Sequence, residues 1–363
     1  MNAKKIRDGL KKKAAGRLLL RALSLLYICV IALRRALYAG GFIKTYKLPV
    51  PVICFGNLSA GGTGKTSTVV MAAMELKKAG YNPAVLIRGY KRRAPGGKLT
   101  ILAEGEAFSP EEAGDEALMI YKMLRDYAIP VLVSSDRYQS GLAALEKFKS
   151  DCLLMDDGYQ FFRLHRDRNI VLINTTMPFS SDNLLPLGNL RETPAGLARA
   201  DAIVLSHCEH ATETGLETLK GEIKKISPSA AVIESMHSPE AFVDGLKKEK
   251  LPLSEFRGKK VVALSGIGDP QSFEDSLVGL KAVPAQIWRY PDHHHFTRDE
   301  LAAVQATREG RPVITTYKDF ARFPSDWAQI LKGDVFILSV KIVFLCDGHK
   351  RLMDVITSVK KGT

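Results

Sequence analysis

The stretch FGNLSAGGTGKTS, residues 55–67, decides the fold. An apolar run, LPVPVICFGNL, leads into it and predicts a buried strand, and the run KTSTVVMAAMELKKAG predicts a helix that ends at Gly80. A strand, a glycine-rich loop and a helix in this order are the context in which the signature G-x-x-x-x-G-K-[ST] binds nucleotide phosphates. Ser59 stands where that signature has its first glycine. Because the task of that glycine is largely conformational, we expect the loop to remain functional.

The chemistry expected at this loop is nucleotide binding. Free backbone N–H groups and the positive end of the helix dipole bind phosphate, Lys65 reaches the β and γ oxygens, and the Thr66 hydroxyl can coordinate Mg²⁺. The predicted nucleotide-binding residues are Gly61, Gly62, Thr63, Gly64, Lys65, Thr66 and Ser67. The alternative is a glycine-rich turn that carries an incidental lysine.

A second motif favours the nucleotide site. The run CLLMDDGYQ, residues 152–160, is an apolar strand that ends in Asp156 and Asp157, the form that a Walker-B magnesium site takes. Paired acids at a strand end can also simply form a turn. In a parallel sheet, however, this strand end and the glycine-rich loop both point to the crevice at the carboxyl ends of the strands.

Short apolar runs alternate with helical periodicity along most of the chain. This alternation predicts an α/β fold, a P-loop-containing parallel sheet with helices on both faces. The composition becomes polar and proline-bearing around residues 227–250, and strand-like segments resume beyond them. We therefore expect a membrane-anchoring helix at 1–40, a P-loop core domain at 41–228 and a smaller C-terminal α/β domain at 229–363.

The first fifty residues carry much of the chain's formal net charge of +13, with twelve Lys or Arg against one acid, Asp8. A charge-free apolar segment, residues 22–33, follows the basic start. It is shorter than the ~20 residues that span a bilayer, although snorkelling arginines would lengthen it. A basic helix with a Leu/Ile face suits an anionic membrane surface and keeps this end cytoplasmic. Whether it spans or lies on the bilayer stays open, and a core helix with a solvated tail is the alternative.

The chain as a whole resembles the tetraacyldisaccharide 4'-kinases, the lipid A kinases of Gram-negative bacteria. The resemblance rests on motifs in family order from about residue 50 to 325: GNLSAGGTGKTS, IRGYKRR, GDEALMI, DDGYQFFRLHRDRNIVLIN, LLPLGNLRETPAGLARADAIVLS, SGIGDPQSF, YPDHHHFT and TTYKDFARF. It implies transfer of the γ-phosphoryl group of ATP, with Mg²⁺, to the 4'-hydroxyl of a tetraacylated disaccharide 1-phosphate. The implied partners are this anionic glycolipid and the cytoplasmic face of the bacterial inner membrane, with no nucleic acid and no obligate protein partner.

The resemblance also implies the roles of site residues. Asp115 in GDEAL matches the family's catalytic acid, the expected proton acceptor, and Asp292 and His293 in YPDHHHFT match a pair in which the histidine assists it. Arg191 in GNLRETP matches an arginine that neutralises charge near the phosphates. Without the family, such residues could simply start a helix or form a surface ion pair. The residues implied around the metal are Thr66, Glu116, Asp156, Asp157, Gln160 and Glu192.

Two positions depart from the family pattern. Phe161 follows Gln160 where the family commonly has histidine, and phenylalanine can neither coordinate a metal nor donate a hydrogen bond. Tyr317 in TTYKD stands where an acid is usual, so we expect only a structural role for its segment.

Two other functions share part of the pattern. A membrane-associated P-loop switch ATPase shares the GGTGKT ending and an amphipathic anchor, but usually carries a lysine directly before the paired glycines, where this chain has Ala60. A basic nucleic-acid-binding ATPase would interleave aromatic residues with its charge, whereas here the charge flanks an apolar helix. Acceptor-dependent consumption of ATP would separate the three functions.

Overall fold

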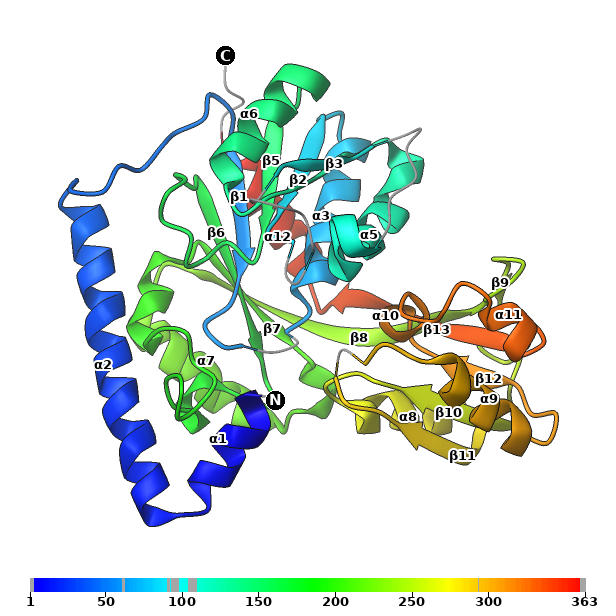
Figure 1. Cartoon of the computed structure of the whole chain (residues 1–363). Helices are drawn as coiled ribbons and strands as arrows, with labels where there is room; N and C mark the ends of the chain where they lie inside the picture. Colours follow the sequence, from blue (N-terminus) through cyan, green and yellow to red (C-terminus); the bar gives the residue numbers. More distant parts are fainter. Residues whose placement is uncertain are drawn as a thin grey trace. The chain divides into compact units, whose positions relative to one another are not determined.

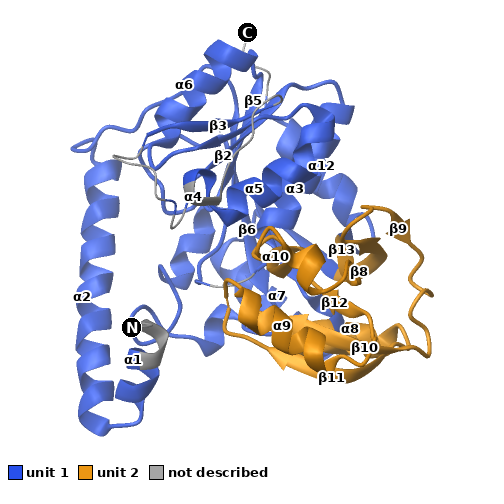
Figure 2. Ribbon diagram, turned by 45° about the vertical axis from the view of Figure 1, so that its right-hand side comes forward, with its two compact units in different colours: residues 1–236, 342–363 blue, residues 237–341 orange. Residues whose placement is uncertain are grey.

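The computed structural model describes residues 3–60, 63–89, 92, 98–103, 110–292 and 294–359 (Figure 1). The chain forms two units: unit 1 comprises residues 1–236 and 342–363, and unit 2 comprises residues 237–341 (Figure 2). The chain leaves unit 1 within one long strand, β8 (Ala231–Asp244), and returns within another, β13 (Val335–Phe344). Unit 2 is therefore an insertion in the chain of unit 1.

Unit 1 is built on a mostly parallel sheet. Its strands lie in the order β7-β6-β1-β5-β2-β4-β3, and each neighbouring pair is parallel except β3 with β4, while the start of β8 pairs with β7. Runs such as VICFG and AIVLS are apolar and buried throughout, as parallel strands covered on both faces are. The strands are β1 (Val52–Gly56), β2 (Pro83–Ile87), β3 (Thr100–Leu102), β4 (Val131–Val133), β5 (Cys152–Asp156), β6 (Arg168–Asn174) and β7 (Ala202–Ser206).

Helices cover both faces of this sheet, which confirms the predicted α/β fold. Alternate strand residues enter two cores: Ile53 and Phe55 pack on the side of α3, α5 and α12, whereas Val52 and Cys54 pack on the side of α6 and α7. The helices are α3 (Lys65–Lys78), α4 (Pro110–Ala113), α5 (Asp115–Leu124), α6 (Arg137–Phe148), α7 (Glu213–Ile226) and α12 (Gly348–Thr357). Short 3₁₀ turns occupy Arg125–Tyr127, Phe179–Ser181, Pro194–Arg199 and Cys208–His210.

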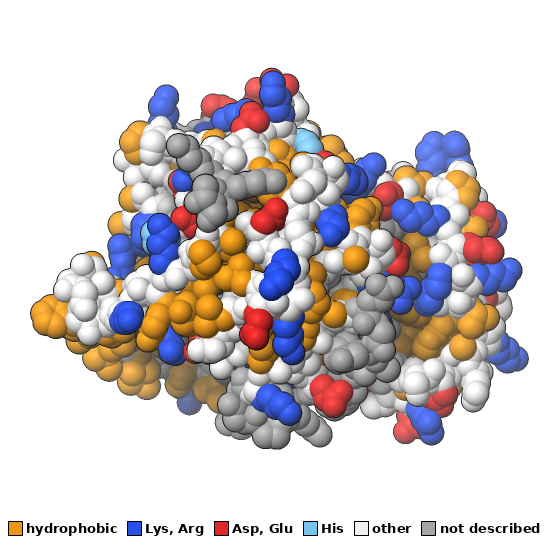
Figure 3. Space-filling model, turned by 90° about the horizontal axis from the view of Figure 1, so that it is seen from above, with side chains coloured by type: hydrophobic (Ala, Val, Ile, Leu, Met, Phe, Trp, Pro, Cys, Tyr) orange, Lys and Arg blue, Asp and Glu red, His pale blue; other side chains and the backbone are white. Residues whose placement is uncertain are grey.

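Two helices, α1 (Ala3–Lys11) and α2 (Ala14–Ala39), begin the chain. One side of α2 packs on unit 1: Leu20 and Ser24 are buried, and the Ser24 hydroxyl donates to the Leu184 carbonyl at 3.1 Å. By length and composition α2 could cross a membrane, a test that a core helix can also pass. Figure 3 shows hydrophobic side chains gathered on the side of the molecule where α2 lies. The exposed apolar residues of α2 are Leu18, Leu19, Leu23, Leu25, Leu26, Val30 and Leu33.

Unit 2 is a smaller α/β unit. Its strands lie in the order β11-β10-β12-β13-β8, with β10 to β13 parallel and β9 antiparallel to β8. Helix α8 packs on one face through Phe273 and Leu277, and α9 packs on the other through Leu301 and Val304. The remaining elements are β9 (Lys250–Leu251), β10 (Lys260–Ser265), β11 (Val283–Arg289), β12 (Val313–Thr315), α8 (Pro270–Gly279), α9 (Arg298–Thr307), α10 (Tyr317–Phe320) and α11 (Trp327–Ile330).

The division into units differs from the boundaries expected from the sequence. The polar segment around 227–250, which we expected to connect two domains, contains the strand β8. The segment 342–363, which we expected in the C-terminal domain, belongs to unit 1, because Leu352 and Ile356 of α12 are buried in its core. An amphipathic pattern shows that a helix packs on a core, but it does not show which core. Composition alone could therefore not reveal that the chain returns to unit 1 after residue 341.

Candidate active site

The phosphate loop joins β1 to α3 at the carboxyl end of a central strand. Gly64 precedes the helix in the left-handed conformation, at φ 77°, which glycine adopts without strain. Ser59 forms an antiparallel bridge with Leu190, and the Ala60 N–H donates to the Asn189 carbonyl at 2.8 Å. Ser59 has no positive φ, so its position does not require glycine. The predicted Gly61 and Gly62 lie outside the described residues.

Buried polar contacts fix the two ends of this loop. The Asn57 side-chain amide donates to the Thr63 hydroxyl at 3.2 Å, and both residues are buried. The Thr68 hydroxyl donates to the Gly64 carbonyl at 3.0 Å. Thr63 therefore shapes the loop through its side chain, while Ser67 lies in the first turn of α3 and is half-buried.

Asp157 joins the strand end to two predicted phosphate-binding cations. Its carboxylate lies 3.5 Å from Lys65 Nζ and accepts from Arg191 at 2.8 Å through both oxygens. Burial alone would raise the pKa of Asp157, but the positive charges of Lys65 and Arg191 outweigh burial and lower it. Asp157 is therefore ionised at neutral pH and holds the ends of both cationic side chains in place.

A second group of oxygens lies beside Lys65. The Thr66 hydroxyl donates to Glu116 Oε1 at 2.9 Å, which brings the first turns of α3 and α5 together. Asp156 is buried, and burial together with the negative charge of Glu116 raises its pKa to about 8. Its Oδ1 is buried and has no hydrogen-bond partner among the described residues. A cation bound here would favour the ionised form of Asp156. The Asp156 and Glu116 carboxylates and the Thr66 hydroxyl would then fit the hard oxygen ligands that Mg²⁺ prefers.

The predicted base, Asp115, opens α5. Gly114 precedes it at φ 85°, and Asp115 is half-buried at the first position of the helix. A carboxylate is stabilised at this end of a helix by the dipole. Because its sequence neighbour Glu116 contacts Thr66, the helix start places Asp115 near the phosphate loop.

Glu192 and Gln160, predicted near the metal, form hydrogen bonds with protein groups. Glu192 is 2% exposed; its Oε1 accepts from the Gln160 amide at 2.8 Å, and its Oε2 accepts from Arg199 at 2.7 Å. Gln160 also donates to the Asn57 carbonyl at 2.9 Å. These contacts link the phosphate loop to the segment that carries Arg191 and Glu192, here called the Arg191 segment. Arg199 lies within the motif LLPLGNLRETPAGLARADAIVLS, but the sequence analysis assigned it no role.

Arg137 is a further buried cation that sequence reasoning missed. Its guanidinium lies 4.7 Å from the centroid of the Phe161 ring, within the range of a cation–π contact. Burial and, less strongly, the charge of Arg88 lower the pKa of Arg137 to about 10. The aromatic face of Phe161 supports this cation without donating a hydrogen bond.

The remaining predicted residues lie in unit 2. Asp292 lies at the end of a turn near Gly268, where an added Cβ would be 3.3 Å from its carboxylate, whereas His293 is outside the described residues. His294 stacks on Tyr290 and its Nε2 lies 2.9 Å from Glu300, a structural arrangement. Tyr317 is the first residue of α10 and is 38% exposed.

Comparisons with known proteins agree on one family. A family model described as tetraacyldisaccharide-1-P 4'-kinase matches residues 16–359. The chain is 40% identical over 345 residues to the tetraacyldisaccharide 4'-kinase of Elusimicrobium minutum, covering 94% of this chain and 91% of that protein. It is 37% identical over 323 residues to that of Syntrophus aciditrophicus, covering 85% of each. The crystal structure of LpxK from Aquifex aeolicus in complex with ATP superposes with a TM-score of 0.73 at 33% identity, covering 94% of this chain and 98% of that one.

Proposed function

The chain belongs to the tetraacyldisaccharide-1-P 4'-kinase family, and from this premise we propose how its own residues perform the reaction. The protein is a kinase that uses ATP and phosphorylates the 4'-hydroxyl of a lipid A disaccharide precursor. The main observation that supports the proposed site is that Asp157 forms ion pairs with both Lys65 and Arg191 beside the phosphate loop.

Lys65 and Arg191 bind and neutralise the phosphates of ATP in this proposal. Phosphoryl transfer needs little covalent help from the protein, so most of the barrier is lowered by positioning and by charge stabilisation. Asp157 contacts both cations and so holds them ready before ATP arrives. ATP phosphates compete with Asp157 for the same side chains, and Gly64 lets the backbone approach them.

Three oxygen-bearing side chains would hold Mg²⁺. Thr66, Glu116 and Asp156 offer a hydroxyl and two carboxylates, and Asp156 Oδ1 has no other partner among the described residues. When bound, the ion neutralises negative charge on the phosphates. We propose that Glu192 and Gln160 position the Arg191 segment rather than coordinate the metal, because both Glu192 oxygens already accept hydrogen bonds from Gln160 and Arg199.

Asp115 is the proposed general base. The 4'-hydroxyl oxygen attacks the γ-phosphorus, its proton passes to the Asp115 carboxylate, and the bond to the β–γ bridging oxygen breaks to release ADP. The place of Asp115 at the start of α5, next to Glu116, supports this role. Asp292 and His293 keep the role that the family resemblance implies, with the histidine assisting Asp115.

Acceptor dependence tests this function against the rival switch ATPase. We expect release of ADP to require tetraacyldisaccharide 1-phosphate in detergent, and one phosphate to enter the lipid for each ADP formed. The measurement is a coupled ADP assay combined with mass analysis of the lipid product. Equal ATP hydrolysis with and without the disaccharide would favour the switch ATPase.

We also propose that the protein works at the cytoplasmic face of the inner membrane, with α2 lying along the bilayer surface. The exposed leucines of α2 supply an apolar face, and the basic residues before it suit anionic lipid. Ser24 and Tyr27 hydrogen-bond to carbonyls of unit 1, at Leu184 and Arg191, which favours a surface position over a full span.

Deleting residues 1–39 is expected to move most of the protein from the membrane fraction to the soluble fraction, since the main apolar face is lost. Because this deletion also removes the Ser24 and Tyr27 contacts, a second variant, Leu25→Glu with Leu26→Glu, changes only exposed positions and should act in the same direction. Sedimentation with inner-membrane vesicles measures the effect. Retention of both variants would mean that another surface binds lipid.

A further inference from the structure

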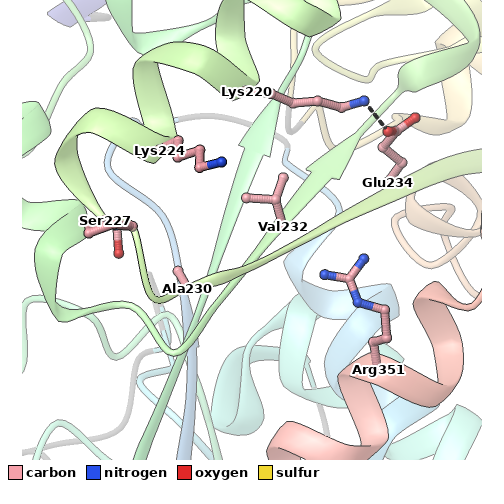
Figure 4. A pocket seen from close by; sticks show the side chains of 8 residues that line it. Lys220, Lys224, Ser227, Ala230, Val232, Glu234 and Arg351 are labelled. Carbon is pink, nitrogen blue, oxygen red and sulfur yellow. Dashed lines mark ion pairs between the residues drawn. The ribbon is translucent and has the colours of Figure 1, made fainter.

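A hollow on unit 1 lies between α7, the first part of β8, and α12 (Figure 4). Its volume is about 380 Å³, at the lower end of the range for small-molecule sites. In Figure 4, Lys224 and Arg351 extend from opposite sides over Val232. None of the residues that line the hollow belongs to the proposed kinase site. They are Lys220, Lys224, Ser227, Pro228, Ala230, Val232, Glu234 and Arg351.

The hollow has an excess of positive charge. Lys220 forms ion pairs with Glu217 at 2.8 Å and with Glu234 at 2.5 Å, so the one acid lining the hollow has a lysine partner, which it shares with Glu217. Within the part of the chain that the structure describes, neither Lys224 nor Arg351 has an ion pair. Two cationic side chains therefore converge without a protein anion between them.

Helix stability does not explain this arrangement. Lys224 lies in the last turn of α7, where a cation is favoured by the helix dipole. Arg351, however, lies in the first turn of α12, where a cation opposes the dipole, although Asp347 directly before the helix offsets part of this cost. An anionic ligand would stabilise an arginine at that position.

A buried hydroxyl belongs to one of the residues in the wall of the hollow. Ser227 lines the hollow, is 3% exposed, and its Oγ is buried with no hydrogen-bond partner in the described part of the chain. A buried hydroxyl left without a partner costs about 1–3 kcal/mol, so such groups are usually satisfied. Because this oxygen is not exposed to the hollow, Lys224 and Arg351, and not the Ser227 hydroxyl, are the groups that a ligand would meet.

We propose that this hollow binds a phosphate group, and that it is a second anion site separate from the ATP site. Arginine binds phosphate through two parallel N–H bonds and lysine binds it as a point charge, so Arg351 and Lys224 form a matched pair for it. Val232, Ala230 and Pro228 offer apolar contact to the organic part of a phosphomonoester. The phosphate can come from a soluble metabolite or from the headgroup of an anionic lipid.

The test compares two double variants of the full-length protein with equal loss of charge. Lys224→Ala with Arg351→Ala removes the lining cations, whereas Lys225→Ala with Lys350→Ala removes their exposed sequence neighbours, which do not line the hollow. Saturating MgADP occupies the kinase site in every sample. Glycerol 3-phosphate is titrated at constant ionic strength and followed by the shift in melting temperature, and binding to phosphatidylcholine vesicles with and without phosphatidic acid is measured in parallel.

We expect glycerol 3-phosphate to raise the melting temperature of the wild-type and of the Lys225/Lys350 control, and its affinity to fall at least ~10-fold in the Lys224/Arg351 variant. Arg351→Lys should weaken binding less, because it keeps the charge and loses the two-point contact. Loss confined to phosphatidic acid vesicles would identify a lipid headgroup as the source of the phosphate. Identical behaviour of the two double variants in both assays would overturn the proposal. Since the readout is binding and not phosphorylation, this result is independent of the kinase assignment.

Discussion

Replacing Lys65 with alanine is expected to lower phosphate transfer to the lipid disaccharide by ~10² or more, because it removes a positive charge placed where negative charge develops. ATP affinity should fall as well, since in the proposed site Lys65 also binds the phosphates before transfer. The fold should survive, because Asp157 keeps its two contacts with Arg191. Turnover of the lipid acceptor and equilibrium binding of ATP are the two measurements.

The matched control lies on the same helix. Lys78 is exposed in the last turn of α3 and pairs only with Glu75 at its surface, so Lys78→Ala removes an equal charge far from the loop. Turnover of this control should stay near that of the wild type. A Lys65→Ala variant that phosphorylates the disaccharide at the control rate would exclude this lysine from the phosphate site.

Replacing Asp115 is expected to lower turnover by ~10² or more while ATP affinity changes by no more than a few fold. The difference from Lys65 arises because a base that faces the acceptor hydroxyl need not contact the nucleotide. Asp115→Asn is the sharper variant, since it keeps the size of the side chain and removes only its ability to accept a proton. Rapid-quench measurement of the phosphoryl-transfer step shows whether the loss is in the chemistry.

Asp126→Ala serves as the control for Asp115, because its carboxylate is 81% exposed in the turn that follows α5. It should leave turnover unchanged. Should Asp115→Asn retain near-normal transfer, the base would have to be another group, and His293 would be the next residue to replace.

The fold of unit 1 was predictable from local pattern. Apolar runs between glycine-rich turns identified the strands, and the loop before Lys65 fixed which strand lies beside the nucleotide. The course of the chain beyond residue 230 was not predictable in this way. A strand such as β8 can continue from one unit into the next, and neither hydropathy nor turn residues record that event.

The part of the candidate site that lies within recognisable motifs could be predicted from the sequence. The strand-end acid Asp157 meets Lys65, as parallel-sheet geometry leads one to expect. Sequence could not reveal that Glu192 is enclosed by Gln160 and Arg199, because burial and partner choice arise from tertiary packing. For the same reason, it could not place Arg137 against Phe161.

The return of the chain to unit 1 has a consequence for biosynthesis. A ribosome completes residues 1–341 before α12 emerges, so the nascent unit 1 lacks the helix that buries Leu352 and Ile356 in its core. Gly348 at the start of this helix lies so close to Ile233 that an added Cβ would be 2.9 Å from its Cγ2. Until the codons for α12 are translated, apolar surface around Ile233 stays uncovered and open to aggregation or chaperone binding. A premature stop codon after residue 341 would therefore damage the nucleotide-binding half of the protein, although every residue of the phosphate loop had been made.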